Sequence, residues 1–295
     1  MRKFILGTDW WTDCDDAIAL RLIARAHKRG DIELCAVGIN ATMEYSVASL
    51  DAFLALEGCF DIPLGIDLAA TDFTGNPPYQ KRLAPRSVRY KSNEEAGDAV
   101  SLYRRILSTA SEPVEIIEIG FLQVLANLLE SGADSISEKS GVELVREKVS
   151  HVWVMAGKWD KDGECEHNFA NNQRARDAAK LFCDRCPVPV TFLGWEVGYG
   201  VITGGKLEHE DHLYTLLCDH RSQNGRHSWD PMLAELALIG DPEAAGYSIV
   251  RGVARVDSRD GSNYFERAVD GIHSYVVKAR EDSYYEDQIN EKIKS

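Results

Sequence analysis

The fold is decided by FILGTDWWTDCDDAIALRLIARA, residues 4–26, which joins a strand to a helix through an acidic turn. Its apolar start, Phe4–Leu6, is typical of a short buried strand. Its end, Ala17–Ala26, repeats apolar residues at i, i+3, i+4 and i+7, which predicts a helix with one buried face. Four carboxylates lie between the two elements, at Asp9, Asp13, Asp15 and Asp16. Ligand sites of open α/β sheets lie at the carboxyl ends of strands, so this turn is the predicted functional site.

The acidic turn has two physical explanations. Negative charge near a helix N-terminus is favoured by about 0.3–1 kcal/mol per group, so one or two of the acids are explained as helix caps. Four acids between residues 9 and 16, the first of them at the strand end, are more than capping requires. Clustered carboxylates repel one another unless a cation compensates, and a hard, oxygen-binding ion such as Ca²⁺ is the usual one. We therefore favour a metal site.

Strand and helix patterns alternate along most of the chain. Expected strands lie at 32–39, 114–119, 152–155 and 188–193, and expected helices at 47–56, 122–129 and 173–182. This alternation predicts an α/β fold with a Rossmann-like, mainly parallel open sheet and flanking helices. Short strands at 249–256 and 275–277, with a turn at 257–261, predict a small antiparallel addition near the C-terminus. We expect residues 1–295 to form a single domain.

The composition argues against several classes of partner. The chain has 44% hydrophobic and 27% charged residues, as in an ordinary globular protein. Its net charge of −14 argues against nucleic acid, which requires a basic face. No apolar run approaches the roughly 18 residues of a membrane span, so no membrane partner is expected. The seven cysteines are odd in number and scattered, which indicates reduced thiols in a cytoplasmic protein.

The acidic turn carries a resemblance to a known family. The pattern Asp-x-x-x-Asp-x-Asp-Asp-Ala-x-Ala-Leu between a first strand and a first helix resembles the nucleoside hydrolase family, in a variant with a longer loop. The resemblance implies the fold of that family and Ca²⁺ as cofactor. It matches Asp9 to the metal-bound general base, Asp16 to a Ca²⁺ ligand and Asp15 to a ribose hydroxyl contact. Asp13 belongs to the longer loop and is matched to no role, and Gly7 stands where the short-loop motif has an acid.

Further segments match the family in order along the chain. Gln123 is matched to a residue whose backbone carbonyl binds Ca²⁺, and Asp230 to the last Ca²⁺ carboxylate. Asp230 before Pro231 is also a good helix start, which is its structural alternative. The resemblance implies sugar or pocket-wall contacts from Asn40, Met155, Glu166 and Asn168. Asp160 stands where the family has an Asn, which leaves one hydroxyl contact open.

The activity implied is hydrolysis of the N-glycosidic bond of ribonucleosides. A water polarised by Ca²⁺ loses a proton to Asp9 and attacks the sugar. Trp229 stands where pyrimidine-accepting members have a His; purine-specific members instead stack a Trp on the base, so purines are slightly preferred. Packing of Trp229 under the following helix is an equal alternative. Aromatic residues are expected along the pocket border, at Trp10, Trp11 and Trp159.

Two other functions stay open. Asp160 and the tryptophan-rich turn favour a hydrolase of another ribosyl or sugar conjugate. A non-catalytic sugar- or metabolite-binding protein would keep the metal site without turnover. A phosphatase of the HAD type is disfavoured, because Trp11 stands where its second acid belongs. The expected partner is a small-molecule nucleoside or sugar conjugate, and the resemblance implies a homo-oligomer, either a dimer or a tetramer.

Overall fold

One mixed sheet forms the centre of the molecule, of which the computed structural model describes residues 1–294. In spatial order its strands are β3 (Leu64–Ile66), β2 (Ile32–Ile39), β1 (Arg2–Thr8), β4 (Val114–Glu118), β5 (Val149–Met155), β7 (Val190–Leu193), β12 (His273–Lys278), β10 (Tyr247–Val256), β11 (Ser262–Arg267) and β6 (Glu164–Cys165). Neighbours from β3 to β12 are parallel, and the last three strands are antiparallel. A separate pair joins β8 (Ile202–Thr203) to β9 (Arg226–His227).

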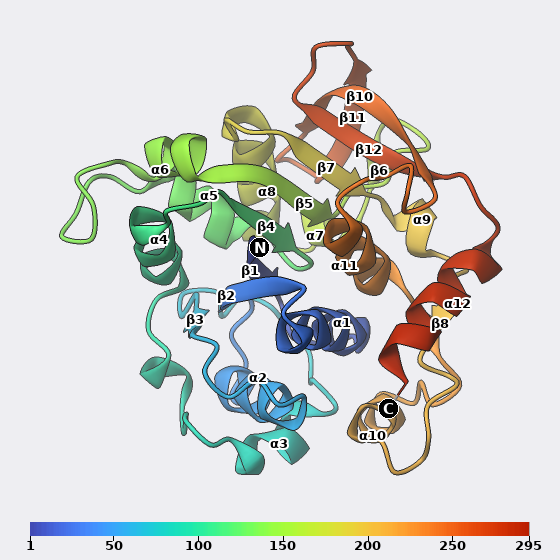
Figure 1. Cartoon of the computed structure of the whole chain (residues 1–295). Helices are drawn as coiled ribbons and strands as arrows, with labels where there is room; N and C mark the ends of the chain where they lie inside the picture. The colour runs from blue at the N-terminus through green and yellow to red at the C-terminus, as the bar shows by residue number, and fades with distance from the viewer. Residues whose placement is uncertain (295) are drawn as a thin grey trace.

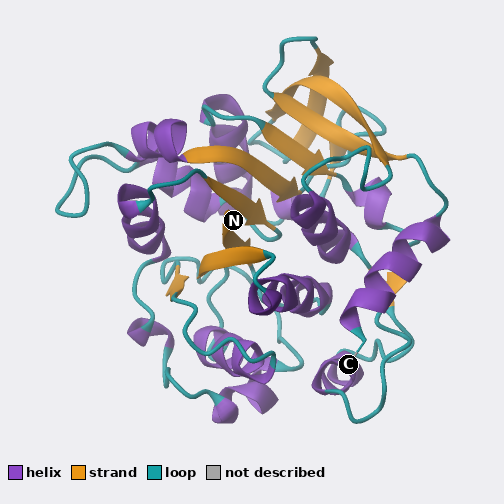
Figure 2. Cartoon of the chain, viewed as in Figure 1, coloured by secondary structure: helices purple, strands orange, loops and turns teal. Residues whose placement is uncertain are grey.

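Helices cover both faces of the sheet (Figures 1 and 2). Buried apolar side chains form two large core clusters. The helices with residues in the first cluster are α1 (Asp15–Arg29), α2 (Ser46–Leu56), α3 (Gln80–Leu83), α9 (Trp195–Gly198), α10 (His212–Asp219), α11 (Trp229–Ile239) and α12 (Asp282–Ile293). Those with residues in the second are α4 (Ala99–Thr109), α5 (Gln123–Glu130), α6 (Gly141–Lys148), α7 (His167–Ala170) and α8 (Gln173–Arg185). Two short 3₁₀ segments span 84–86 and 93–95. Strand β1 feeds both clusters, since Phe4 and Leu6 belong to the first and Ile5 to the second.

The predicted α/β fold with a mainly parallel sheet and an antiparallel addition is confirmed. The addition continues the main sheet, because β12 pairs in parallel with β7 and antiparallel with β10. It also contains β11, which was not predicted. The sequence of β11, SNYFER, lacks the alternation of apolar and polar residues that is typical of a half-buried strand. The last four residues of this strand are mostly exposed.

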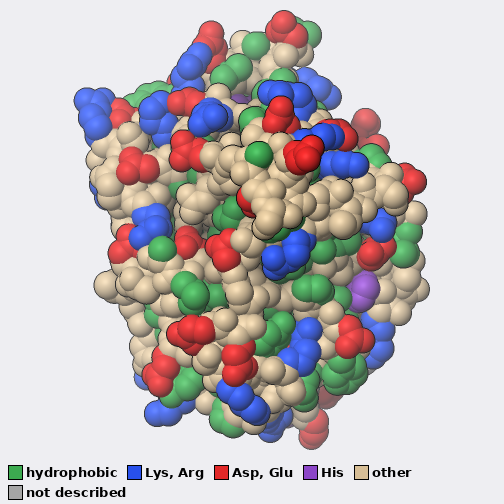
Figure 3. Space-filling view, turned by 90° about the vertical axis from the view of Figure 1, so that its left-hand side faces the viewer, with side chains coloured by type: hydrophobic (Ala, Val, Ile, Leu, Met, Phe, Trp, Pro, Cys, Tyr) green, Lys and Arg blue, Asp and Glu red, His purple; other side chains and the backbone are tan. Residues whose placement is uncertain are grey.

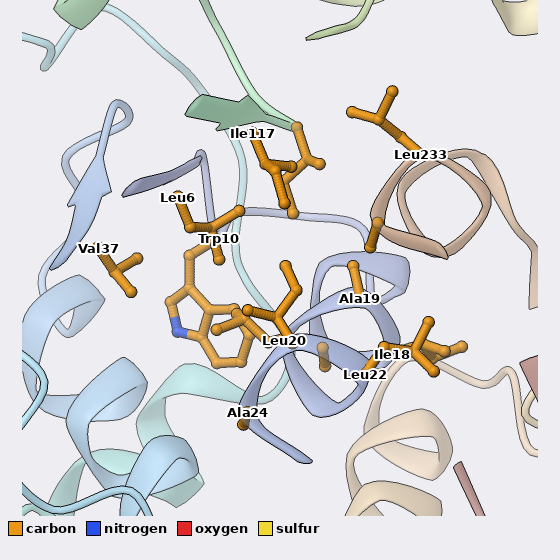
Figure 4. Packing of buried hydrophobic residues seen from close by; sticks show 14 of the residues in the cluster. Leu6, Trp10, Ile18, Ala19, Leu20, Leu22, Ala24, Val37, Ile117 and Leu233 are labelled. Atoms are coloured by element: carbon orange, nitrogen blue, oxygen red, sulfur yellow. The ribbon is translucent and has the colours of Figure 1, made fainter. Parts of the chain in front are cut away.

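Trp10 lies in the hydrophobic core, which corrects the expectation that it borders the pocket. Its backbone has φ of 45°, in the left-handed region that non-glycine residues rarely adopt. The indole is fully buried and lies beside Leu20 of α1 (Figure 4). The ring lies 5.3 Å from Phe53 and 5.1 Å from Tyr79, and its N–H donates to Ser49 at 2.8 Å. Trp10 therefore anchors the acidic turn to α2.

None of the helices within residues 1–294 is both long enough and apolar enough to cross a membrane. On the face shown in Figure 3, Lys and Arg side chains are interspersed with Asp and Glu.

A buried ion cluster joins α1, α2 and α10. The guanidinium of Arg21 is fully buried and lies 2.6 Å from a carboxylate oxygen of Glu57 and 2.6 Å from one of Asp211. His212 also contacts Glu57, at 2.7 Å. Ion pairs without access to water depend on complete pairing, since removal of one partner leaves the other charge buried.

Replacing Arg21 by Met should destabilise the protein by about 3–5 kcal/mol, because Glu57 and Asp211 lose their pairing with a buried guanidinium. The matched control is Arg29→Met, since Arg29 pairs with Asp31 at 2.8 Å between side chains that are more than half exposed. That change should cost less than about 1 kcal/mol. Urea unfolding of both variants measures the difference, and equal transition midpoints would contradict a structural role for the Arg21 cluster.

Candidate active site

A cavity of about 260 Å³ opens at the carboxyl ends of the central strands, where the sequence places the acidic turn. Its acidic lining consists of Asp9, Asp13, Asp15, Asp16, Glu166 and Asp230. The remaining lining residues are Trp11, Thr12, Ile119, Met155, His167, Asn168, Trp195, Arg226 and Trp229. The structure thus brings together residues from distant parts of the chain, from β1 to α11. Of the predicted site residues, Asn40 and Gln123 are not among the described residues that line the cavity.

Three carboxylates form a compact buried cluster on one side of the cavity. Asp15 and Asp16 belong to the first turn of α1, and Asp230 belongs to the first turn of α11. Each offers an oxygen, and these oxygens lie within 4.8 Å of one another. The backbone N–H of Asp230 donates to Asp15 Oδ2 at 3.1 Å, which joins the two helix ends. All three side chains are at most 5% exposed.

Burial and mutual repulsion raise the pKa of each of these carboxyls well above its ordinary value, and the same holds for the pKa of Asp9. Hydrogen bonds offset only part of this effect. Asp9 accepts from the backbone of Trp11 at 3.2 Å, and Asp16 accepts from the Thr8 hydroxyl. A buried set of oxygen donors with excess negative charge fits a hard divalent cation such as Ca²⁺. The donor set includes Asp15, which the family resemblance matches to a sugar contact instead.

Asp13, the acid of the longer loop, is held by Arg226. The guanidinium donates to both carboxylate oxygens, at 2.9 and 2.5 Å. Burial disfavours the charged carboxyl, but the Arg226 charge and hydrogen bonds outweigh it, so the pKa of Asp13 is lowered. Arg226 also lies 5.4 Å from the ring centre of Trp229. The pair therefore ties the acidic turn to the segment that leads into α11.

Glu166 and Asn168 form the wall beside β5. Glu166 caps α7 by accepting from the backbone of Asn168 at 2.9 Å, and its second oxygen accepts from Gly157 at 2.9 Å. Burial raises the pKa of Glu166 to about 7. The amide of Asn168 donates to the Met155 carbonyl at 2.9 Å, so all three predicted residues of this wall are fixed by local bonds.

Asn40 and Gln123 lie close together beneath the acidic turn. Asn40 is fully buried, donates from its amide to Glu118 at 2.8 Å and accepts from the backbone of Phe121 at 3.0 Å. The side chain of Gln123 donates to the Asn40 carbonyl. Their predicted contacts with sugar and ion stay predictions.

Aromatic side chains bound two sides of the cavity. Trp11 stacks on His167 at 5.8 Å, and Trp195 faces Trp229 at 6.4 Å and 28°. Trp229 is fixed by a bond from its indole N–H to the Trp195 carbonyl, 2.8 Å long. Trp195 was missed by sequence reasoning, although it directly follows the strand end at Leu193–Gly194.

Trp159 and Asp160 lie elsewhere. Both line a second cavity beside β11 and β12. Trp159 is 6% exposed and packs in the core on Phe192 at 5.0 Å. The expectation that Trp159 borders the pocket is therefore wrong, and exposed Asp160 pairs with Lys158 at 3.3 Å.

Solved structures of other proteins share this architecture. No protein-family model and no curated protein sequence matches the chain. A purine-preferring ribonucleoside hydrolase from Gardnerella vaginalis matches with a TM-score of 0.72 at 16% identity, over 99% of this chain and 98% of that one. An inosine-uridine preferring nucleoside hydrolase from Bacillus anthracis matches with a TM-score of 0.66 at 13% identity, over 99% of both chains. The chain has the nucleoside hydrolase fold.

The type III effector protein XopQ, in a structure with adenosine diphosphate ribose, shares the same fold. Its TM-score is 0.69 at 12% identity, over 99% of this chain and 93% of that one. Proteins with different functions share this fold, so the function of this chain has to be argued from its site residues.

The buried carboxyls predict how stability depends on pH when metal is removed. Burial raises the pKa of Glu118 to about 8 and that of Glu166 to about 7, from 4.5 in the unfolded chain. The native state then binds more protons than the unfolded state between these values, so stability falls as pH rises from about 4.5 to about 8. Urea unfolding in a chelator across this interval measures the effect.

The matched control for this prediction is the double variant Glu118→Gln, Glu166→Gln, which removes two of the carboxyls whose pKa is raised. Its stability should fall less steeply over the same interval. Stability of the wild type that rises with pH, or an equal slope in the double variant, would contradict the assignment.

Proposed function

We propose that this protein is a Ca²⁺-dependent hydrolase of the N-glycosidic bond of ribonucleosides, with purine nucleosides preferred. The observation that carries the proposal is the buried cluster of Asp15, Asp16 and Asp230 at the strand ends, in a cavity with aromatic rings on two sides. The nucleoside hydrolase fold supports it. The expected form is a cytoplasmic homo-oligomer, a dimer or a tetramer.

The proposed metal ligands are Asp9, Asp16, Asp230 and the backbone carbonyl of Gln123, and the geometry adds Asp15 as a further candidate. Bound Ca²⁺ would lower the pKa of a water and position it. Asp9, at the end of β1 and on the cavity wall, takes the proton of that water. The water oxygen bonds to C1′ of the ribose, the bond from C1′ to the base breaks, and the base leaves with a proton from solvent.

Sugar hydroxyls are held by Asp15, Asn40, Glu166 and Asn168, with Met155 at the wall. Glu166 and Asn168 support this role best, since backbone bonds fix both in the cavity. Fixed polar groups hold the sugar in one orientation, which lowers the entropic part of the barrier. Trp229 stacks on the leaving base, and its neighbour Trp195 extends the same aromatic wall.

A second candidate function is hydrolysis or binding of a larger ribosyl conjugate. The observation that favours it is Arg226, the one Lys or Arg among the described lining residues. A cation at that position suits a substrate with phosphate groups, such as the adenosine diphosphate ribose in the XopQ structure. Against it, both oxygens of Asp13 already accept from this guanidinium.

Replacing Asp9 by Asn should reduce kcat for inosine and adenosine by about 10³-fold, because an amide cannot accept the proton of the water. Release of free ribose from a panel of purine and pyrimidine nucleosides, with Ca²⁺ or with a chelator, measures the effect. The matched control is Asp287→Asn, at an exposed position on α12, which should leave kcat unchanged. Activity that survives both the chelator and Asp9→Asn would exclude this mechanism, whereas tight binding without ribose release indicates a binding protein.

Replacing Trp229 by Leu should lower kcat for inosine by about tenfold or more, because the purine loses the ring that stacks on it. Hydrolysis of 4-nitrophenyl ribofuranoside should be nearly unchanged, since nitrophenolate leaves without a proton. The conservative variant Trp229→Phe keeps a ring and should retain most activity on inosine. Equal losses on both substrates would show that Trp229 only packs under α11.

A further inference from the structure

The carboxylate of Glu118 lies over the backbone of β1 at Gly7. The two residues are register partners in neighbouring parallel strands. A methyl group at residue 7 would lie 2.0 Å from Glu118 Oε2 and 2.6 Å from Oε1, so only glycine leaves room for the carboxylate. Glu118 is fully buried and does not belong to the described cavity lining. Its register partner Gly7 is two residues before Asp9, yet this acid has no role in the steps described above.

One oxygen of Glu118 makes all of its hydrogen bonds. Oε1 accepts from the amide of Asn40 at 2.8 Å and from the backbone N–H of Gly120 at 3.1 Å. The other amide atom of Asn40, Oδ1, accepts from the backbone of Phe121 at 3.0 Å. Oε2 has no hydrogen-bond partner among residues 1–294. The network therefore needs one acceptor atom, and the full carboxylate is not required for its bonds.

This network surrounds the backbone that leads into Asp9. The N–H of Asn40 donates to the Thr8 carbonyl at 3.0 Å, from the β2 side. On the β4 side, the N–H of Ile119 donates to the Gly7 carbonyl at 3.0 Å. Gly120 packs so closely that a methyl group there would lie 2.4 Å from the backbone nitrogen of Asp9. A shift of Asn40 or of the turn at 119–121 would therefore be transmitted to Asp9.

We propose that Glu118 is a positioning residue that fixes Asp9 through Asn40 and Gly120 and contacts neither substrate nor ion. The network joins the ends of β2, β1 and β4, and so sets where the strand-end carboxylate lies in the cavity. The expected changes in kcat rest on the proposed function, whereas the expected displacement of Asn40 and Asp9 is independent of the proposed function.

The test compares two variants of similar size. Glu118→Gln keeps an acceptor at Oε1, so kcat should stay within about threefold of wild type. Glu118→Met removes the acceptor, so kcat should fall by about 10²-fold, because the Asn40 amide and the backbone that leads into Asp9 lose the atom that holds them. Ile116→Val, which shortens a buried side chain on the same strand, controls for general loss of stability. Equal losses in the Gln and Met variants would overturn the proposal, since the charge itself would then be required.

A second comparison uses the steric contact with Gly7. Gly7→Ala should reduce kcat about as much as Glu118→Ala, because the new methyl displaces the carboxylate. The double variant should be no worse than Glu118→Ala alone, since the group that collides is already absent. Fully additive losses would overturn the coupling of the two residues.

Crystal structures of the Gln and Met variants separate this proposal from the proposed function. In Glu118→Met the Asn40 amide and the Asp9 carboxylate should be displaced, and in Glu118→Gln both should keep their wild-type positions. Unchanged positions in Glu118→Met would overturn the proposal, whatever the activity. If the wild type releases ribose from none of the nucleosides, the proposed function fails, and these structures still decide the role of Glu118.

Discussion

Repulsion between buried carboxylates is the constraint on which the rest of this site depends. Asp15, Asp16 and Asp230 are held together by the ends of α1 and α11, and burial takes away the water that would screen them. Arg226, the cation in the lining, is already paired with Asp13. A divalent cation bound by these oxygens would remove the repulsion, so ion binding and the stability of this end of the sheet are linked.

Contacts around the acidic turn hold its carboxylates in place despite their mutual repulsion. Trp10 leaves the acidic turn in a left-handed conformation and anchors it in the core beside Phe53. Glu118 and Asn40 hold the backbone before the turn, and the Asp13–Arg226 pair holds the residues after it. The acidic turn is thus fixed to the ends of β2 and β4 and to β9 by contacts within the protein. Such preorganisation is what a site of fixed geometry requires.

The parts predicted from the sequence are those that depend on local periodicity. The strand and helix around Asp9 follow from apolar spacing, and the order of strands places Glu166 and Asp230 at the same edge. Contacts over long separations were not predictable in this way. Nothing local indicates that Asp13 pairs with Arg226, 213 residues away. The side on which Trp10 points depends on its left-handed backbone, and the burial of Trp159 depends on packing against Phe192 and Tyr275, which lie far along the chain.

The two halves of the cavity differ in how strictly they specify a ligand. Beside β5, Glu166 and Asn168 are fixed by several backbone bonds, which suits hydroxyl groups in set positions. At Trp195 and Trp229 the wall consists of indole rings, which accept any flat ring system. His167, which stacks on Trp11, is the one imidazole in the described lining, and burial lowers its pKa, so the ring is neutral near pH 7. Under the proposed function, a neutral His167 favours a leaving base that solvent can protonate, and a stacked purine meets that requirement better than a pyrimidine.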